Sequence, residues 1–274
     1  MESAIFLIAG FIIGTFGTLI GAGGGFILVP LLLIFYPEFS PETTTAISIA
    51  VVAVNAISGS VAYARSGRID YRAGLIFAFY TIPGAILGVL TVQYIPQHSF
   101  NTIIGILLVG LASYLFVKNK KDITFIEQTT AKKGCRAHTL VDSSGITYNY
   151  TYNPVYGNLV SLVVGYISPL LGIGGGIIHV PAMVNWLKFP VHIATATSHF
   201  ILAVMATASV FTHAYKGTYN DPAILHMILF ISLGVVPGAQ LGAMLSHKIK
   251  SNVILQVLAA CLAIVGIRIL FSSF

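Results

Sequence analysis

Neutral polar side chains inside long apolar runs are the residues of this chain that could do chemistry. They are Thr45, Ser48 and Asn55 in one run, and Thr195, Ser198 and His199 at the matching place in a later run. Ser48 and Asn55 are seven residues apart, so in a helix they share one face. Such groups can hydrogen-bond a ligand, or they can bond neighbouring helices to one another. The sequence leaves both interpretations open.

Two glycine runs offer a second kind of binding group. They are Gly23, Gly24 and Gly25, and Gly174, Gly175 and Gly176, each inside a repeated segment in which nine of seventeen aligned positions are identical. Three glycines in a row weaken a helix, and lipid tolerates broken backbone only where protein buries it or where it lines a cavity. Exposed N–H groups beside a helix start attract anions. Two facing breaks would therefore form an anion site, and close helix packing is the alternative interpretation.

Two histidines stand where the first half has apolar residues. His179 matches Leu28, and His199 matches Ile49. Histidine changes charge near neutral pH, and within a membrane it marks a functional candidate. The alternative is a neutral, hydrogen-bonded histidine at a helix contact.

The chain lacks the residues that several classes of function require. The chain has no His-Glu-x-x-His or Gly-x-Ser-x-Gly motif, and its eight acidic residues lie at termini, in loops or in a polar linker. This disfavours catalysis and ion sites built on intramembrane carboxylates. The two cysteines, Cys135 and Cys261, have no metal-site spacing, and we expect neither a disulfide between them nor a cofactor. The net charge of +6 comes from cations between apolar runs, which indicates membrane orientation rather than nucleic-acid binding.

The elements that must position these residues are membrane helices. Charged residues make up 8% of the chain, against roughly 25% in soluble domains, and mean hydropathy is +0.90. We predict an all-α integral membrane protein of two homologous halves, residues 1–117 and 156–274, joined by a polar cytoplasmic linker, 118–155. Each half begins with a glycine-broken region and continues with three apolar runs. The broken regions are 3–36 and 156–187, and the runs are 43–65, 72–95, 99–117, 193–215, 223–246 and 252–271.

The arm after the first glycine run is too short to cross a bilayer. Phe26 to Tyr36 has eleven residues, which as a helix reach about 16 Å, roughly half the hydrocarbon core. Each broken region is thus expected to be a re-entrant hairpin or a discontinuous helix. Hairpins would make the halves inverted repeats, the arrangement that we favour, whereas single crossings would make them parallel. In the linker, 139–141 and 146–152 alternate around a turn and predict a small β-hairpin.

The doubled Gly-x-Gly-Gly-Gly…Val-Pro segment, the Pro-Gly-Ala-x-x-Gly motifs at Pro83 and Pro237, and the polar linker resemble the TauE/SafE sulfite-exporter family. The resemblance covers nearly the whole chain outside the linker. It implies a bacterial or archaeal inner-membrane permease for sulfite, organosulfonates such as sulfoacetate, or related anions such as thiosulfate. The shared motifs do not choose among these substrates.

We therefore expect a secondary transporter that exports a small sulfur-containing anion across the plasma membrane by alternating access. The alternatives are an anion channel, an intramembrane enzyme, and a structural or sensory membrane protein. The expected partners are the anion and the lipid bilayer, and the sequence leaves open whether the chain forms a homodimer.

Overall fold

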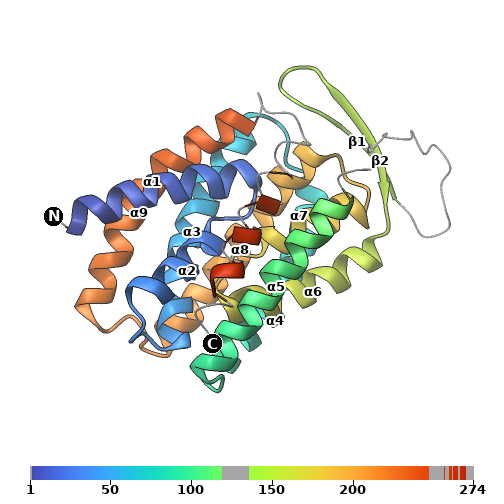
Figure 1. Cartoon of the computed structure of the whole chain (residues 1–274). Helices are drawn as coiled ribbons and strands as arrows, with labels where there is room; N and C mark the ends of the chain where they lie inside the picture. Colours follow the sequence, from blue (N-terminus) through green and yellow to red (C-terminus); the bar gives the residue numbers. More distant parts are fainter. Residues whose placement is uncertain are drawn as a thin grey trace.

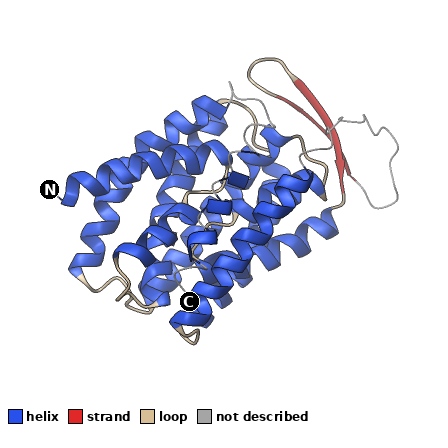
Figure 2. Cartoon of the chain, in the orientation of Figure 1, coloured by secondary structure: helices blue, strands red, loops and turns tan. Residues whose placement is uncertain are grey.

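The computed structural model describes residues 2–118 and 136–246, together with 256, 259–260, 262–264 and 266–269. Helices make up nearly all of this part, and one two-stranded hairpin projects from it (Figure 2). Both cysteines, linker residues 119–135 and half of the predicted final run, 252–271, lie outside the described residues.

The helices of the first half follow the apolar runs closely. They are α1 (Glu2–Ile20), α2 (Gly25–Phe35), α3 (Pro41–Arg65), α4 (Tyr71–Val92) and α5 (Gln97–Lys118). Ser40 caps α3, since its hydroxyl accepts the Thr43 N–H at 3.2 Å and Pro41 opens the helix. Asp70 caps α4 in the same way, accepting the Ala73 N–H at 3.0 Å.

The second half repeats this order with α6 (Pro154–Leu171), α7 (Gly176–Asn185), α8 (Val191–Tyr215) and α9 (Pro222–Ser246). Within the described residues, six helices are long and apolar enough to span a membrane: α1, α3, α4, α6, α8 and α9. The two helices that follow the breaks, α2 and α7, have only eleven and ten residues. These six differ in part from the predicted runs, because α1 and α6 of the broken regions are among them, whereas α5, the predicted run 99–117, is not. The mostly helical architecture with several apolar helices long enough to span a membrane agrees with the prediction.

The first helix of each half packs along the third long helix of the other half. Helix α1 lies along α9, and α6 lies along α4 (Figure 1). A Cβ added to Gly238 would overlap the Phe11 carbonyl oxygen, and one added to Gly84 would lie 2.5 Å from that of Leu162. Glycine thus allows close backbone approach at both crossings, which accounts physically for the Pro-Gly-Ala-x-x-Gly motifs.

Helices α3 and α8 form the buried centre and run antiparallel. Lys216, at the end of α8, pairs with Glu42 in the first turn of α3. At the other end, the Asp70 N–H, just beyond α3, donates to the Thr197 hydroxyl in the second turn of α8 at 3.0 Å. Val52 and Leu202 are buried together midway between these two contacts.

Strands β1 (Arg136–Val141) and β2 (Thr147–Tyr152) form the antiparallel hairpin that the linker sequence predicts. Arg136 pairs with Tyr152 at the open end, and Val141 pairs with Thr147 beside the turn. The turn residue Gly145 has φ 80°, a conformation that glycine adopts without strain. The all-α expectation therefore holds for the body of the molecule, and the hairpin is the one that the linker sequence predicts.

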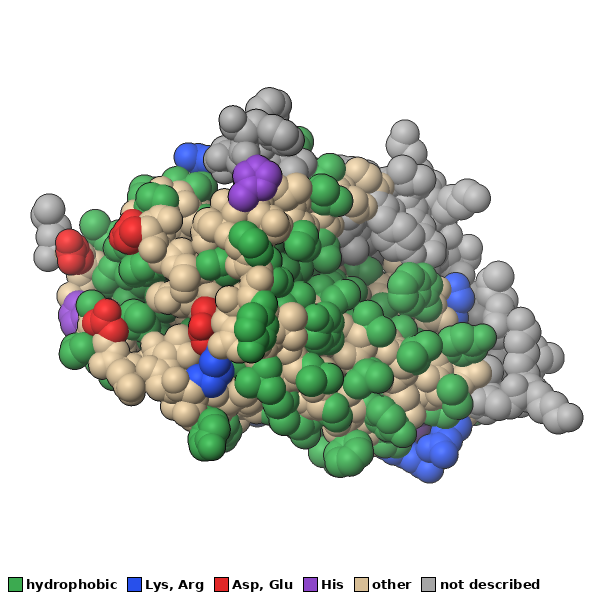
Figure 3. All heavy atoms as spheres, turned by 90° about the horizontal axis from the view of Figure 1, so that it is seen from below, with side chains coloured by type: hydrophobic (Ala, Val, Ile, Leu, Met, Phe, Trp, Pro, Cys, Tyr) green, Lys and Arg blue, Asp and Glu red, His purple; other side chains and the backbone are tan. Residues whose placement is uncertain are grey.

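Apolar side chains cover much of the outer surface. Figure 3 shows one face on which they dominate, while charged side chains lie mainly toward the left and right ends. Phe79 on α4 is 70% exposed and Phe211 on α8 is 71% exposed. Large exposed apolar side chains between two charged ends fit a belt in contact with lipid.

Candidate functional site

The two glycine breaks turn through left-handed backbone. Gly21, Gly23 and Gly24 have φ values of 78°, 81° and 84°. In the second break, Gly172 and Gly174 have φ values of 67° and 80°. Other residues adopt this region only with strain, so the local fold requires glycine at these positions.

The breaks contact one another, backbone against backbone. A Cβ on Gly25 would overlap the carbonyl oxygen of Gly172, and a Cβ on Gly176 would overlap that of Gly21. The close approach that the repeat predicts is therefore present. In this conformation Gly25 and Gly176 serve packing directly, because a carbonyl of the opposite break occupies the space beside each.

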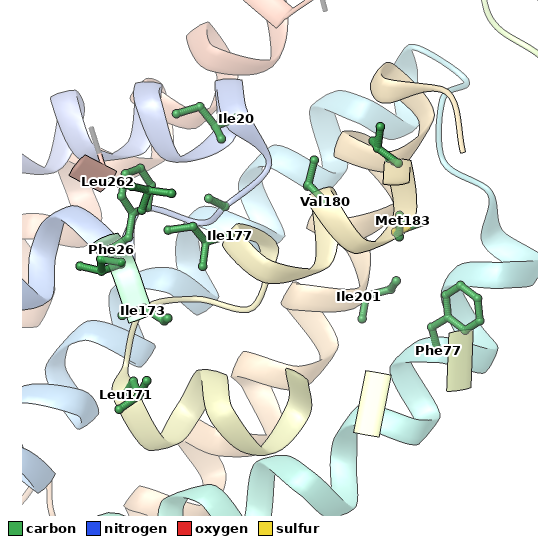
Figure 4. Packing of buried hydrophobic residues seen from close by; sticks show 14 of the residues in the cluster. Ile20, Phe26, Phe77, Leu171, Ile173, Ile177, Val180, Met183, Ile201 and Leu262 are labelled. Carbon is green, nitrogen blue, oxygen red and sulfur yellow. The ribbon is translucent and has the colours of Figure 1, made fainter. Parts of the chain in front are cut away.

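Apolar side chains surround the meeting point. Figure 4 shows Ile20 and Phe26 beside the first break and Leu171, Ile173 and Ile177 beside the second, all members of one buried cluster. This cluster keeps water from the broken backbone, whose polar groups must then find partners within the protein.

A buried polar cluster lies beside the first break. The Thr18 hydroxyl of α1 donates to Asn55 Oδ1 of α3 at 2.9 Å, and Tyr63 OH donates to the Thr18 carbonyl at 2.7 Å. His199 Nε2 lies 3.3 Å from Thr18 Oγ1 and 3.4 Å from the Asn55 carbonyl. Because Thr18 gives its single hydroxyl proton to Asn55, an Nε2–H of a neutral His199 can donate to the Asn55 carbonyl.

Four fully buried polar atoms, on residues of this cluster or within four positions of His199 in α8, have no protein partner. They are Asn55 Nδ2, Thr195 Oγ1, Ser198 Oγ and His199 Nδ1. Thr195 lies directly against the first break, since a Cβ on Gly21 would be 2.7 Å from its methyl group. Buried polar groups are normally hydrogen-bonded. A concentration of unpartnered ones therefore marks a place suited to a polar ligand.

The other predicted site residues lie elsewhere. Ser48 donates to the Gly172 carbonyl at 2.6 Å, and Thr45 donates to the Glu42 carbonyl of its own helix at 3.0 Å. Both pack against the second break rather than within the cluster. His179 is separate again, because its Nε2 lies 3.1 Å from Ser161 Oγ and its ring centre 6.3 Å from that of Phe77.

Sequence reasoning missed Thr18 and Tyr63. Thr18 lies three residues before the first break, but its match in the second half is Pro169. A search for polar residues at matching positions therefore passes over it. The sequence feature that could have identified Thr18 is a hydroxyl side chain in an apolar run, one turn before a glycine break.

No charged side chain takes part in the hydrogen bonds described above for this cluster. Among the described residues, the buried charged side chains are Arg68, Asp70 and Asp142, and all three lie beyond the end of α3 or in the hairpin. The described part of the chain also has no group of three or more histidine, cysteine or acidic residues that could hold a metal. The cluster thus offers neutral hydrogen-bonding groups in an apolar surrounding.

Comparison with known proteins agrees with this architecture. The model of the family "Sulfite exporter TauE/SafE" matches residues 6–269. The probable membrane transporter protein YunE of Bacillus subtilis is 30% identical over 283 residues, covering 100% of this chain and 99% of the relative. A probable membrane transporter protein of Methanocaldococcus jannaschii is 24% identical, covering 97% and 94%. No solved structure gives a significant match.

Proposed function

The chain belongs to the sulfite exporter TauE/SafE family of membrane transporters, and on that premise we propose that it exports a small sulfur-containing anion by alternating access. The substrate class is sulfite, thiosulfate or an organosulfonate such as sulfoacetate. The protein acts in the bacterial or archaeal plasma membrane.

The buried polar cluster beside the first break carries this proposal. The Asn55 amide and the hydroxyls of Thr195 and Ser198 can donate to the oxygens of a pyramidal or tetrahedral oxyanion. Neutral donors bind an anion less tightly than arginine does, and moderate affinity lets a carrier release its substrate. The residues thus fit a transported anion better than a permanently bound one.

Antiparallel α3 and α8 support an inverted repeat. The Glu42–Lys216 contact brings the start of α3 and the end of α8 together, and we infer that both lie at one face of the membrane. Helix α9 starts from that same face, and α1 runs parallel to α9, since Gly10 faces Ile231 and Gly14 faces Val235. We infer that α2 and the residues after it lead back toward the face where α3 begins, which would make α1 and α2 a re-entrant pair.

The distribution of cations supports a cytoplasmic hairpin. Arg65, Arg68 and Arg72 lie at the end of α3 or the start of α4, and Arg136 opens the hairpin on the same side. Positive residues concentrate on the cytoplasmic side of membrane proteins. The face with Glu42 and Lys216 is then external.

Transport by purified protein in liposomes tests the proposal. We expect saturable flux and counterflow of sulfite, thiosulfate or sulfoacetate, with chloride as the comparison anion. Non-saturating flux would support a channel instead. If none of these anions is transported, the proposed substrate class is refuted, and an enzyme or a sensory protein is favoured instead.

Variants of the cluster locate the site. Asn55→Leu and Ser198→Ala should each weaken anion binding in calorimetry roughly 5- to 150-fold, which corresponds to about 1–3 kcal/mol for a lost buried hydrogen bond. Ser161→Ala is the matched control, because that hydroxyl is also buried but bonds His179 away from the cluster. Unchanged affinity in both cluster variants would place the ligand elsewhere.

A further inference from the structure

The hairpin turn is fixed to the α3–α4 loop by a buried ion pair. Asp142 Oδ2 accepts from Arg68 Nε at 3.1 Å and from Arg68 Nη2 at 3.0 Å. The Ser143 N–H also donates to the Ser66 carbonyl at 3.0 Å. Both charged side chains are almost fully buried. Removing one partner of such a pair leaves an uncompensated buried charge, so the hairpin is held firmly.

The charge of Asp142 is itself stabilised. Burial alone would raise its pKa, but hydrogen bonds from the Ile146 amide, from Arg68 and from the Ser144 amide outweigh burial and lower the pKa. Asp142 is therefore ionised at neutral pH, and the attachment of the hairpin is strongest in that state.

Asp70 joins the hairpin to helices of both halves. Its Oδ2 accepts from Tyr150 OH at 2.7 Å and from His138 Nδ1 at 2.8 Å, both on the hairpin. Its Oδ1 caps α4, and its backbone N–H donates to Thr197 of α8. One buried residue thus links β1, β2, α4 and α8, and Thr197 directly precedes Ser198 and His199 of the polar cluster.

Aromatic contacts extend this link across the two halves. The rings of Tyr150 and Tyr152 lie 4.7 Å and 5.0 Å from that of Phe189, just before α8. Tyr152 also meets Phe77 of α4 at 6.0 Å. The hairpin therefore bridges α4 of the first half and the entry to α8 of the second.

The corresponding contacts at the opposite face are made by helix ends and a loop. There Lys216 and Thr218 bond Glu42, and Tyr219 OH donates to the Ala46 carbonyl at 3.0 Å. The α8–α9 loop thus contacts the start of α3. In the same way, the α3–α4 loop contacts the start of α8. In the described structure, the hairpin reinforces only the second of these contacts.

We propose that hairpin β1–β2 is a clasp that holds closed a cytoplasmic gate, the contact between the α3–α4 loop and the start of α8, so that substrate can enter from the cytoplasm only when the hairpin is released or moves with one half. This inference rests on the proposed function, because it assumes that the two faces open in turn. The closed clasp keeps the start of α8, and with it the polar cluster, out of contact with the cytoplasm.

Thiol labelling tests the clasp without any substrate. With Cys135 and Cys261 replaced by alanine, Ala196→Cys places a reporter on α8 in the buried cluster that also contains Ile69 of the α3–α4 loop. In inside-out vesicles, Asp142→Asn should raise labelling by a membrane-impermeant maleimide about tenfold, the ratio for a 1.4 kcal/mol shift toward the open state. Thr139→Ala, which removes only an exposed bond within the hairpin, is the control and should leave labelling unchanged.

A reversible cross-link tests the same idea in the other direction. Ser66→Cys with Ser143→Cys should form a disulfide that stops transport, and reduction should restore it. Transport at the parental rate with the disulfide formed, or equal labelling in Asp142→Asn and Thr139→Ala, would overturn the clasp. If Asp142→Asn does not fold, the cross-link alone decides. Altered labelling in a protein that moves none of the anions would refute the substrate and leave the clasp standing.

Discussion

Substituting alanine for Gly176 tests whether backbone contact between the breaks is essential. The added methyl would overlap the Gly21 carbonyl oxygen and lie 2.7 Å from Ala22 Cα. Both neighbours are backbone atoms, which cannot move aside as the end of a side chain can. Overpacking of a core typically costs 1–3 kcal/mol, and rigid backbone on both sides places this variant at about 3 kcal/mol or above.

The adjacent glycine supplies a matched control. A Cβ on Gly175 would meet Met205 Cε at 3.1 Å and Val164 Cγ1 at 3.3 Å, and its φ of −60° is ordinary for alanine. Because a methionine side chain adapts readily, we expect Gly175→Ala to cost less than about 1 kcal/mol. Gly110 in α5 has nothing within 4 Å of an added Cβ, so Gly110→Ala should be neutral or slightly stabilising.

Thermal unfolding in detergent and transport in liposomes measure these variants. At about 2–4 °C per kcal/mol, Gly176→Ala should lower the melting temperature by roughly 6–12 °C, and it should abolish transport. Gly175→Ala should remain within about 4 °C of the parent by the same scale. Equal behaviour of Gly175→Ala and Gly176→Ala would show that the break contact does not limit stability, and the reasoning from backbone overlap would fail.

Three further predictions concern the break, the hairpin and the histidine. Cysteines at Ala22 and Ile173 should be joined by a short thiol cross-linker within one chain, because these residues lie at the contacting breaks; failure to cross-link in a folded protein would contradict the arrangement. Because the folded pKa of Asp142 is lowered, its carboxylate stabilises hairpin attachment fully above the ordinary pKa of 3.8, and this stabilisation is lost as pH falls through the lowered folded pKa. Spin-label distances between hairpin and α8 should thus stay constant from pH 8 to about 5 and lengthen only near pH 4 or below. If His199 carries a coupling proton, His199→Gln should transport with no pH dependence while still binding anion, and a retained pH profile would remove it from that role.

The helices were predictable because each follows from local sequence. Apolar length sets their extents, and Ser40 with Pro41 marks the start of α3. The meeting of the two breaks was also predictable, since a repeated weakness in an apolar run must be buried within the protein. The site role of the predicted residues stays a prediction, although Asn55 and His199 share one hydrogen-bonded cluster.

The rest depends on which segments meet in space. Thr18 has no polar counterpart in the second half, so the repeat concealed it. Asp70 and Asp142 looked like ordinary loop acids, and only the folded chain brings them to buried partners in the hairpin, the α3–α4 loop and α8. Spacing along the chain likewise could not show that His179 lies apart from His199.

The exchange of helices between the halves constrains how the chain assembles. Helix α1 emerges from the ribosome first, yet the glycines of its packing partner α9 are made near the end of synthesis. Similarly, the glycines of α4 pack on α6, which is synthesised later as part of the second half. Neither half can bury its own glycine grooves alone, so the early helices remain without their partners until the second half has been inserted. The molecule is therefore expected to reach its native packing after translation, and two halves produced as separate chains would each depend on the other to fold.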